Sequence, residues 1–168
     1  MTVTIRPATT ADTSVLGQLG ALLVHVHHEF DRDRFIAPTP QTPGHYGRFL
    51  AGQLKRKDAL VLVAEVDGGV VGYVYAALEG SDWLTLRGPA GVIYDLMVDP
   101  SHRRQGIGLS LLNKAIDALA QQGAPRVMLS TAEPNRAAQT LFAGAGFRPT
   151  LIEMTREFPD TGQRPKAT

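Results

Sequence analysis

The chain has 168 residues, of which 43% are hydrophobic and 20% are charged, values typical of a soluble globular domain with a substantial core. The formal net charge of +1 is too balanced to favour nucleic acid or an anionic membrane as the main partner. The sequence contains no cysteine, which excludes disulfides, thiolate metal sites and a cysteine nucleophile.

The sequence contains no targeting signal that we recognise. No apolar run approaches the roughly 18 residues of a transmembrane span, and residues 1–12 lack the apolar centre of a signal peptide. We therefore expect a cytoplasmic protein with no membrane partner. Residues 1–160 are expected to form one domain, and residues 161–168 a disordered tail.

The first third of the chain predicts a strand followed by two helices. Residues 2–6 alternate apolar with polar side chains, as in a short strand, and a proline follows. Thr9 and Asp12 have the spacing of a capping box ahead of apolar residues at helical intervals, which predicts a helix ending near Phe30. A proline-rich connection then leads into a second, short helix around residues 46–54.

Histidines and an acidic residue cluster at the end of the first predicted helix. His25 and Glu29 are one turn apart, with His27 and His28 between them. No third ligand follows at a fixed spacing, as zinc sites usually require. The pattern therefore favours a polar helix end over a metal site, with contact to an acceptor substrate as the remaining alternative.

The middle of the chain predicts an antiparallel meander. Residues 59–66 and 70–78 are largely apolar strands, and residues 67–69 form a hairpin turn between them. A longer connection over residues 79–90 leads to a third strand over residues 92–98.

The last third of the chain alternates helices with strands. A helix follows the meander and ends at Gly123, and residues 126–130 form a strand that should lie parallel to the third strand of the meander. Residues 135–144 predict another helix, and residues 150–158 a final strand. The fold class is mixed α/β (α+β), with a central, partly parallel, twisted sheet and helices on both faces.

A glycine turn with two arginines joins the third strand of the meander to the next helix. The free N–H groups and the positive end of a helix attract an anion. Gly106 and Gly108 permit close backbone approach, and Arg103 and Arg104 add charged donors, so a diphosphate suits this turn. The P-loop pattern is absent, and Leu111 stands where a dinucleotide-binding turn needs its third glycine.

The pattern Arg103-x-x-Gly106-x-Gly108 resembles the acetyl-CoA pyrophosphate loop of the GNAT family of N-acetyltransferases. A second pattern, N-x-x-A-x-x-L-F over residues 135–142 followed by Gly-Phe, resembles the family's next motif at the expected spacing. The resemblance implies a GNAT-like sheet and acetyl-CoA as co-substrate, without a metal. The cofactor-binding residues that it implies are Leu96, Met97, Val98, Arg103, Arg104, Gln105, Gly106, Ile107, Gly108, Asn135 and Phe142.

The resemblance also implies a mechanism in which a primary amine attacks the thioester directly. The strand equivalent to residues 93–98 splays from its parallel neighbour in this family, and the N–H near Val98 would polarise the thioester carbonyl. Asp95 is the candidate base for the amine, with a structural or substrate-binding role as the alternative. Family members often carry a tyrosine where this chain has Phe142, so the thiolate would take its proton from water or from another residue such as Tyr94, or no general acid would act.

The sequence leaves the acceptor open as a small-molecule or peptide amine. Its pocket would be formed by the first two helices, the connection over residues 31–44 and the loop over residues 79–90. Glu29, Asp31 and Asp33 would suit a cationic amine, but exposed acids at a helix end are usually only solvated.

Several alternatives remain open at this point. The protein could use a longer acyl-CoA, could modify a protein N-terminus, or could be a catalytically idle acyl-CoA-binding module, which only Phe142 supports. Asn135 could cap its helix or bind the pantetheine arm. Tyr73, Tyr75 and Trp83 are expected to pack in the core or the hairpin rather than to contact substrate. The oligomeric state is open, and a homodimer is common among proteins of this kind.

Overall fold

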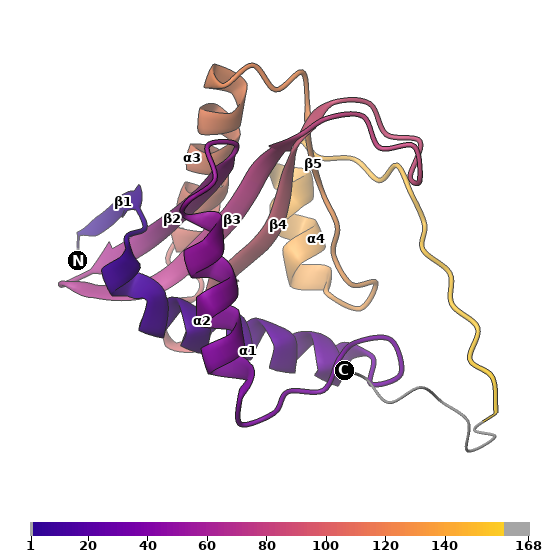
Figure 1. Cartoon of the computed structure of the whole chain (residues 1–168), viewed down its shortest axis with the longest axis horizontal. Coiled ribbons are helices and arrows are strands. Elements are labelled where there is room, and N and C mark those ends of the chain that lie inside the picture. Colours follow the sequence, from indigo (N-terminus) through magenta and orange to yellow (C-terminus); the bar gives the residue numbers. More distant parts are fainter. Residues whose placement is uncertain (1, 160–168) are drawn as a thin grey trace.

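A five-stranded sheet organises the part of the chain that the computed structural model describes, residues 2–159 (Figure 1). The strands lie in chain order, from β1 to β5, across the sheet. β1 to β4 pair antiparallel, whereas β5 is parallel to β4, so the predicted mixed sheet is confirmed. The strand bounds are Val3–Pro7 for β1, Ala59–Val66 for β2, Gly69–Glu79 for β3, Ala90–Val98 for β4 and Val127–Leu129 for β5.

Four α-helices flank the sheet within the described residues, and two short 3₁₀ helices, Thr10–Asp12 and Pro100–His102, precede α1 and α3. The helices are α1 (Thr13–Phe30), α2 (Thr42–Gln53), α3 (Ile107–Gln121) and α4 (Arg136–Gly144). α1 and α2 cover one face of the sheet and α3 covers the other, as predicted (Figure 1). None of these helices is long and apolar enough to cross a membrane.

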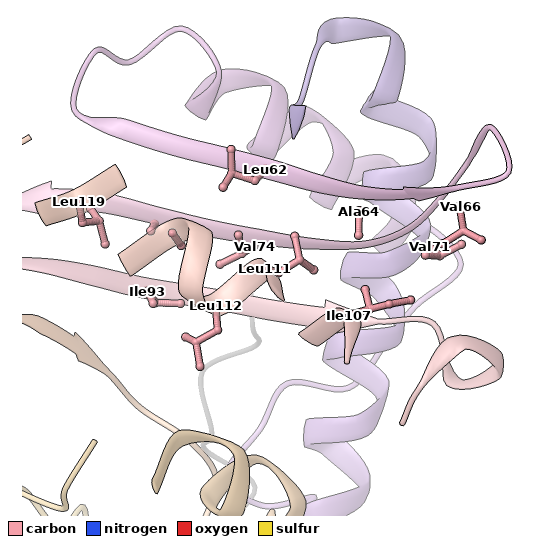
Figure 2. Packing of buried hydrophobic residues seen from close by; sticks show 12 residues of the cluster. Leu62, Ala64, Val66, Val71, Val74, Ile93, Ile107, Leu111, Leu112 and Leu119 are labelled. Carbon is pink, nitrogen blue, oxygen red and sulfur yellow. The ribbon is translucent and has the colours of Figure 1, made fainter. Parts of the chain in front are cut away.

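The hydrophobic core between α3 and the sheet fixes the position of α3, the helix that begins at the glycine turn. Leu111 and Leu112 of α3 lie directly over the strands, as Figure 2 shows. They pack on Leu62, Val74 and Ile93, which come from β2, β3 and β4 respectively. Because these side chains are almost fully buried, the start of α3 has a fixed position relative to the end of β4.

The core on the opposite face fixes α1 and α2. Leu16 and Leu19 of α1 and Leu50 of α2 are buried against Val63 and Tyr73 of the sheet. Neighbouring residues of β2 and β3 alternate between the two clusters, as the pleat of a strand requires.

The predicted capping box at Thr9 and Asp12 is present and is part of a larger network. The backbone N–H of Thr9 donates to Oδ2 of Asp12 at 2.7 Å, and Arg6 donates to both carboxylate oxygens of Asp12. Arg6 also pairs with Glu65 of β2 at 2.9 Å. β1, the start of α1 and β2 are therefore tied together at this end of the sheet.

The strand predicted for residues 150–158 is wrong, because these residues form no strand and are exposed. They run as an extended segment outside the sheet (Figure 1). Ile152 is 83% exposed, and Glu153 forms an ion pair with Arg34. β5 has only three residues, so it offers a further strand few ladder hydrogen bonds. The disordered tail predicted for residues 161–168 lies outside the described residues.

Two smaller predictions also differ from the structure. α2 begins at Thr42, before the predicted start, because Pro43 is tolerated in the first helical turn. Trp83 does not pack as predicted, since the residue is 87% exposed on the β3–β4 connection, which projects beyond the sheet in Figure 1. Tyr73 and Tyr75 are buried, as predicted.

Candidate functional site

β4 and β5 separate soon after they pair. Residues 91–93 of β4 pair with residues 127–129, whereas residues 94–98 have no strand beside them on that side within the described chain. The splay expected for this strand is therefore present. The backbone N–H and C=O groups of this stretch that point away from β3 can bind an extended ligand, because no strand pairs with them.

A β-bulge at Tyr94 decides which face of the sheet carries Asp95. Tyr75 of β3 is opposite Asp95, but the next residue of β3 is opposite Ile93, so Tyr94 has no partner of its own. Ile93 packs under α3, whereas Met97 packs against the α1–α2 face. Regular alternation would put Ile93, Asp95 and Met97 on one face. The bulge instead places Asp95 on the α1–α2 face.

Asp95 is a nearly buried carboxylate with two tyrosine donors. The residue is 8% exposed, and its Oδ2 accepts hydrogen bonds from Tyr46 at 2.7 Å and from Tyr73 at 3.1 Å. Burial raises the pKa of the Asp95 carboxyl, and the two hydrogen bonds partly offset that rise. No hydrogen bond within the described chain reaches Oδ1, and no fully buried side-chain oxygen there lacks a partner, so Oδ1 retains some contact with solvent.

The two tyrosines remain neutral donors because burial and the adjacent carboxylate raise the pKa of each hydroxyl. Tyr46 comes from α2, and its ring lies directly over Gly20 of α1. A Cβ atom at Gly20 would lie 2.0 Å from Cδ1 of Tyr46, so only glycine allows this approach. Tyr46, Tyr73 and Gly20 were not predicted as site residues, since their roles depend on how α1, α2 and β3 pack.

The glycine turn lies between the end of β4 and the start of α3. Gly106 is the N-cap residue of α3 with φ +78°, a left-handed conformation, and no side chain caps the helix. Arg103 donates from Nε to the carbonyl oxygen of Val98 at 3.1 Å, which ties the turn to β4. Arg103, Arg104, Gln105 and Gly106 are exposed, so this surface has two cationic side chains beside the free N–H groups of a helix.

The other predicted cofactor residues differ in what they can offer a ligand. Met97 and Ile107 have buried side chains, and Leu96 and Val98 pack against the core under α3, so these residues would bind a ligand mainly through the backbone. Gly108 has room for a Cβ atom, which would meet Leu141 at 3.7 Å.

α4 lies beyond β5 and carries the second motif. Oδ1 of Asn135 accepts a hydrogen bond from the backbone N–H of Ala138 at 3.2 Å, so Asn135 caps the helix. Phe142 packs edge-on against Phe147, with ring centroids 6.0 Å apart. Tyr94, the alternative proton donor, is 47% exposed and donates to Oε1 of Glu79 at 2.7 Å.

Glu29 in the last turn of α1 and Asp31 just after the helix have local partners. Glu29 pairs with Arg32 at 3.0 Å, and Oδ1 of Asp31 accepts hydrogen bonds from the backbone N–H groups of Asp33 and Arg34. Among residues 2–159 no group of three His, Cys, Asp or Glu side chains could hold a metal ion.

A family model described as the acetyltransferase (GNAT) family matches residues 24–147 of the chain. The chain belongs to the GNAT acetyltransferase family. The matched region contains both motifs, the splayed strand and Asp95. The family resemblance inferred from the glycine turn is thereby confirmed.

Two sequence relatives are also named acetyltransferases. A mycothiol acetyltransferase of Thermobispora bispora is 37% identical over 96 residues, which are 55% of this chain and 31% of that protein. The chain thus spans only about a third of the length of that relative. An uncharacterized N-acetyltransferase of Bacillus subtilis, YhfO, is 28% identical over 145 residues, 85% of this chain and 88% of that protein. These relatives support acyl transfer by a GNAT protein.

Solved structures agree on the fold. A mutant of the BH1408 protein from Bacillus halodurans has a TM-score of 0.78 at 21% identity, over 92% of this chain and 99% of that one. The aminoglycoside N-acetyltransferase AAC(6')-Iy, solved in complex with CoA, has a TM-score of 0.71 at 15% identity, over 94% and 95% of the two chains.

Proposed function

We propose that the protein transfers an acetyl group from acetyl-CoA to a primary amine by direct attack of the amine on the thioester. The observation that carries this proposal is the junction of the splayed end of β4 with the uncapped N-terminus of α3 at Gly106. The splayed end of β4 suits an extended pantetheine arm, and the N-terminus of α3 suits a pyrophosphate. Family membership and the neighbour solved with CoA support the same assignment.

The chain offers the co-substrate three kinds of contact in this proposal. Backbone groups of residues 96–98 bind the pantetheine arm, and an N–H near Val98 stabilises the negative charge that develops on the thioester oxygen. The N–H groups at the start of α3 bind the pyrophosphate, with Arg103 and Arg104 beside it. Phe142 provides an apolar contact from α4 and has no proton to donate.

Asp95 is proposed to receive the proton of the amine. The attack forms a C–N bond and breaks the C–S bond, so the amine loses a proton and the departing thiolate gains one. The unpaired oxygen Oδ1 of Asp95 can accept the first proton, directly or through water, while the tyrosine hydrogen bonds hold Oδ2. Burial raises the pKa of this carboxyl, which makes it a stronger base than an exposed aspartate. Water supplies the proton for the thiolate.

The main alternative is an acyl-CoA-binding module without catalysis. Phe142 favours it, because the hydroxyl group that many family members have at this position is missing. A longer acyl chain or a protein N-terminus as acceptor would use the same junction. The balanced charge of the chain supports a small-molecule or peptide amine over nucleic acid as the partner.

Calorimetric titration with acetyl-CoA tests the cofactor assignment. We expect acetyl-CoA and desulfo-CoA to bind and ATP not to bind. Replacing Gly106 by Val should reduce affinity at least tenfold, because a β-branched residue resists φ +78° and its side chain would project at the turn. Binding of acetyl-CoA with unchanged affinity by Gly106→Val would contradict the assignment.

Gly123→Val is the matched control for this experiment. Gly123 has φ +91° and, like Gly106, has no atoms within 4 Å of the place that a Cβ atom would occupy, but it lies at the other end of α3. Both variants therefore suffer similar backbone strain, of order 1–2 kcal/mol. Only Gly106→Val should lose acetyl-CoA. Thiol release with candidate amines then separates an enzyme from an idle binding module.

A further inference from the structure

A hollow with a volume of about 230 Å³ lies between the C-terminal half of α1, the loop after it and α2. Its lining contains no carboxylate, lysine or arginine among the described residues. Four of its side chains are apolar or aromatic, and only Thr42 and His45 are polar. The lining residues are Val24, Ile36, Thr42, His45, Tyr46 and Phe49.

Tyr46 connects this hollow to the proposed base. Tyr46 is one of the residues that line the hollow, and its hydroxyl donates to Oδ2 of Asp95 at 2.7 Å. Tyr46 therefore belongs both to the lining of the hollow and to the surroundings of the carboxylate. A second hollow, of about 280 Å³, lies between the start of α1 and α2 and is lined by Arg48 among others, but none of its lining residues hydrogen-bonds to Asp95.

An aromatic surface continues from the hollow across the sheet. The ring of Phe49 contacts Tyr46 and Tyr75 edge-on, with centroids 5.8 Å apart in each pair. Tyr75 in turn stacks on Tyr94 at 5.1 Å. Phe49 and Tyr94 are each 47% exposed, so this aromatic surface is open to a ligand and reaches the bulge beside Asp95.

The charges around the hollow do not favour a polycation. Glu29 already pairs with Arg32, and the Asp31 carboxylate holds the backbone of its own loop. An apolar group gains from leaving water for an uncharged, partly aromatic wall, whereas a second ammonium group would lose hydration there without a partner.

We infer that the acceptor is a primary amine that carries one apolar group of the size of a single or fused ring. The ring lies in the hollow between α1 and α2, and the amine nitrogen lies at Oδ1 of Asp95. A cavity of about 150 Å³ is enough to hold benzene, so a hollow of about 230 Å³ accommodates a phenyl or indole group. This inference rests on the proposed function and names the substrate class for the same site.

The first experiment compares amines by thiol release. With saturating acetyl-CoA, kcat/KM for 2-phenylethylamine and tryptamine should exceed that for ethylamine and for spermidine at least tenfold. The difference should lie mainly in KM, because the ring contributes binding and not chemistry. Equal or better turnover of spermidine or ethylamine would overturn the inference.

The second experiment fills the hollow. Val24→Trp adds a large side chain at the lining and should raise KM for 2-phenylethylamine at least tenfold while leaving acetyl-CoA affinity unchanged. His25→Trp adds the same side chain at the next, exposed position, which does not line the hollow, and should leave KM unchanged. Equal KM values for the two variants would contradict the inference.

A second variant provides the same test if Val24→Trp does not fold. Ile36 lies on the lining and is 75% exposed, so Ile36→Glu costs little packing. It should raise KM for 2-phenylethylamine through the charge that it brings to an apolar wall. An unchanged KM in a folded Ile36→Glu protein would count against the inference.

Titration with 2-phenylethanol, followed by chemical shifts of the protein, separates this inference from the proposed function. The alcohol carries the ring but no amine, so it should bind the CoA-loaded protein and be excluded by Val24→Trp. Absence of thiol release with every amine, with the alcohol still bound, would overturn the enzymatic proposal and leave the ring site supported. Thiol release without binding of the alcohol would overturn the ring site alone.

Discussion

At the scale of single residues, the site is organised by a carboxylate whose two oxygens have different surroundings. Oδ2 of Asp95 accepts both tyrosine hydrogen bonds, whereas Oδ1 accepts none within the described chain and is not fully buried. The hydrogen bonds orient the group and limit the rise in its pKa that burial causes. Asp95 is therefore held in place through one oxygen and available through the other.

Asp95→Asn tests the base directly. Asparagine can still accept from both tyrosines, so the fold should persist while kcat falls by roughly 10²-fold or more, as expected for loss of a general base. A base acts when deprotonated, and burial raises the pKa of Asp95, so wild-type kcat/KM should rise with pH through that raised pKa. This limb should vanish in the variant. A variant whose pH–rate profile matches that of the wild type would leave Asp95 a structural role.

Tyr46→Phe removes the hydroxyl that donates to Asp95 and keeps the aromatic ring of this residue. The variant removes a hydrogen bond that lowers the pKa of Asp95, so the ascending limb of the pH–rate profile should move to higher pH. KM for an aromatic amine should change little, because the ring remains. Tyr75→Phe is the control, since the Tyr75 hydroxyl donates to Gln53 and not to Asp95. An equal shift in both variants would exclude a specific role for Tyr46.

At the scale of elements, the contact between α1 and α2 sets the position of Tyr46. The two helices approach through glycines, and a Cβ atom at Gly17 would lie 2.3 Å from the carbonyl oxygen of Pro43, just as one at Gly20 would enter the Tyr46 ring. Close approach of these helices is thus a condition for the hydrogen bond between Tyr46 and Asp95.

Gly20→Ala should displace Tyr46 and reduce activity. The added methyl group would overlap the ring, and overpacking of this kind typically costs about 1–3 kcal/mol of stability. Gly52→Ala in α2 is the control, because its Cβ would meet nothing within 4 Å and alanine is the better helix former. We expect kcat to fall and the thermal midpoint to drop only for Gly20→Ala. Similar kcat values in the two variants would show that the ring can move without loss of function.

The network of Arg6, Asp12 and Glu65 lies at the N-terminal end of α1. It makes the stability of the protein depend on pH. Hydrogen bonds from Arg6 are the main cause that lowers the pKa of Asp12 to about 2. A lowered carboxyl pKa adds stability above the ordinary aspartate range, and this stability is lost as pH falls towards 2. Asp12→Asn should therefore cost about 2 kcal/mol at pH 7 and much less near pH 2, as measured by urea unfolding. A cost that does not change with pH would contradict this electrostatic origin.

At the scale of the whole molecule, local patterns in the sequence predicted most of the elements but not their joint geometry. The helix starting after Thr9 and Asp12, the glycine turn at Gly106 and the motif at Asn135 depend on residues close together in sequence, and the structure has them. The bulge at Tyr94 and the donor Tyr46 depend on pairing between distant elements. No periodicity in the sequence could indicate either of them.

The wrong strand prediction for residues 150–158 also concerns pairing between distant elements. The exposure of this segment can be tested through its effect on stability. Four apolar residues occur there among polar ones, yet Ile152 is 83% exposed. Ile152→Ala should change the free energy of unfolding by less than about 0.5 kcal/mol, whereas Leu112→Ala, fully buried under α3, should cost about 2–5 kcal/mol. Chemical unfolding of the two variants measures the difference. A large cost for Ile152→Ala would mean that this segment is buried in solution, by the sheet or by a second copy of the chain.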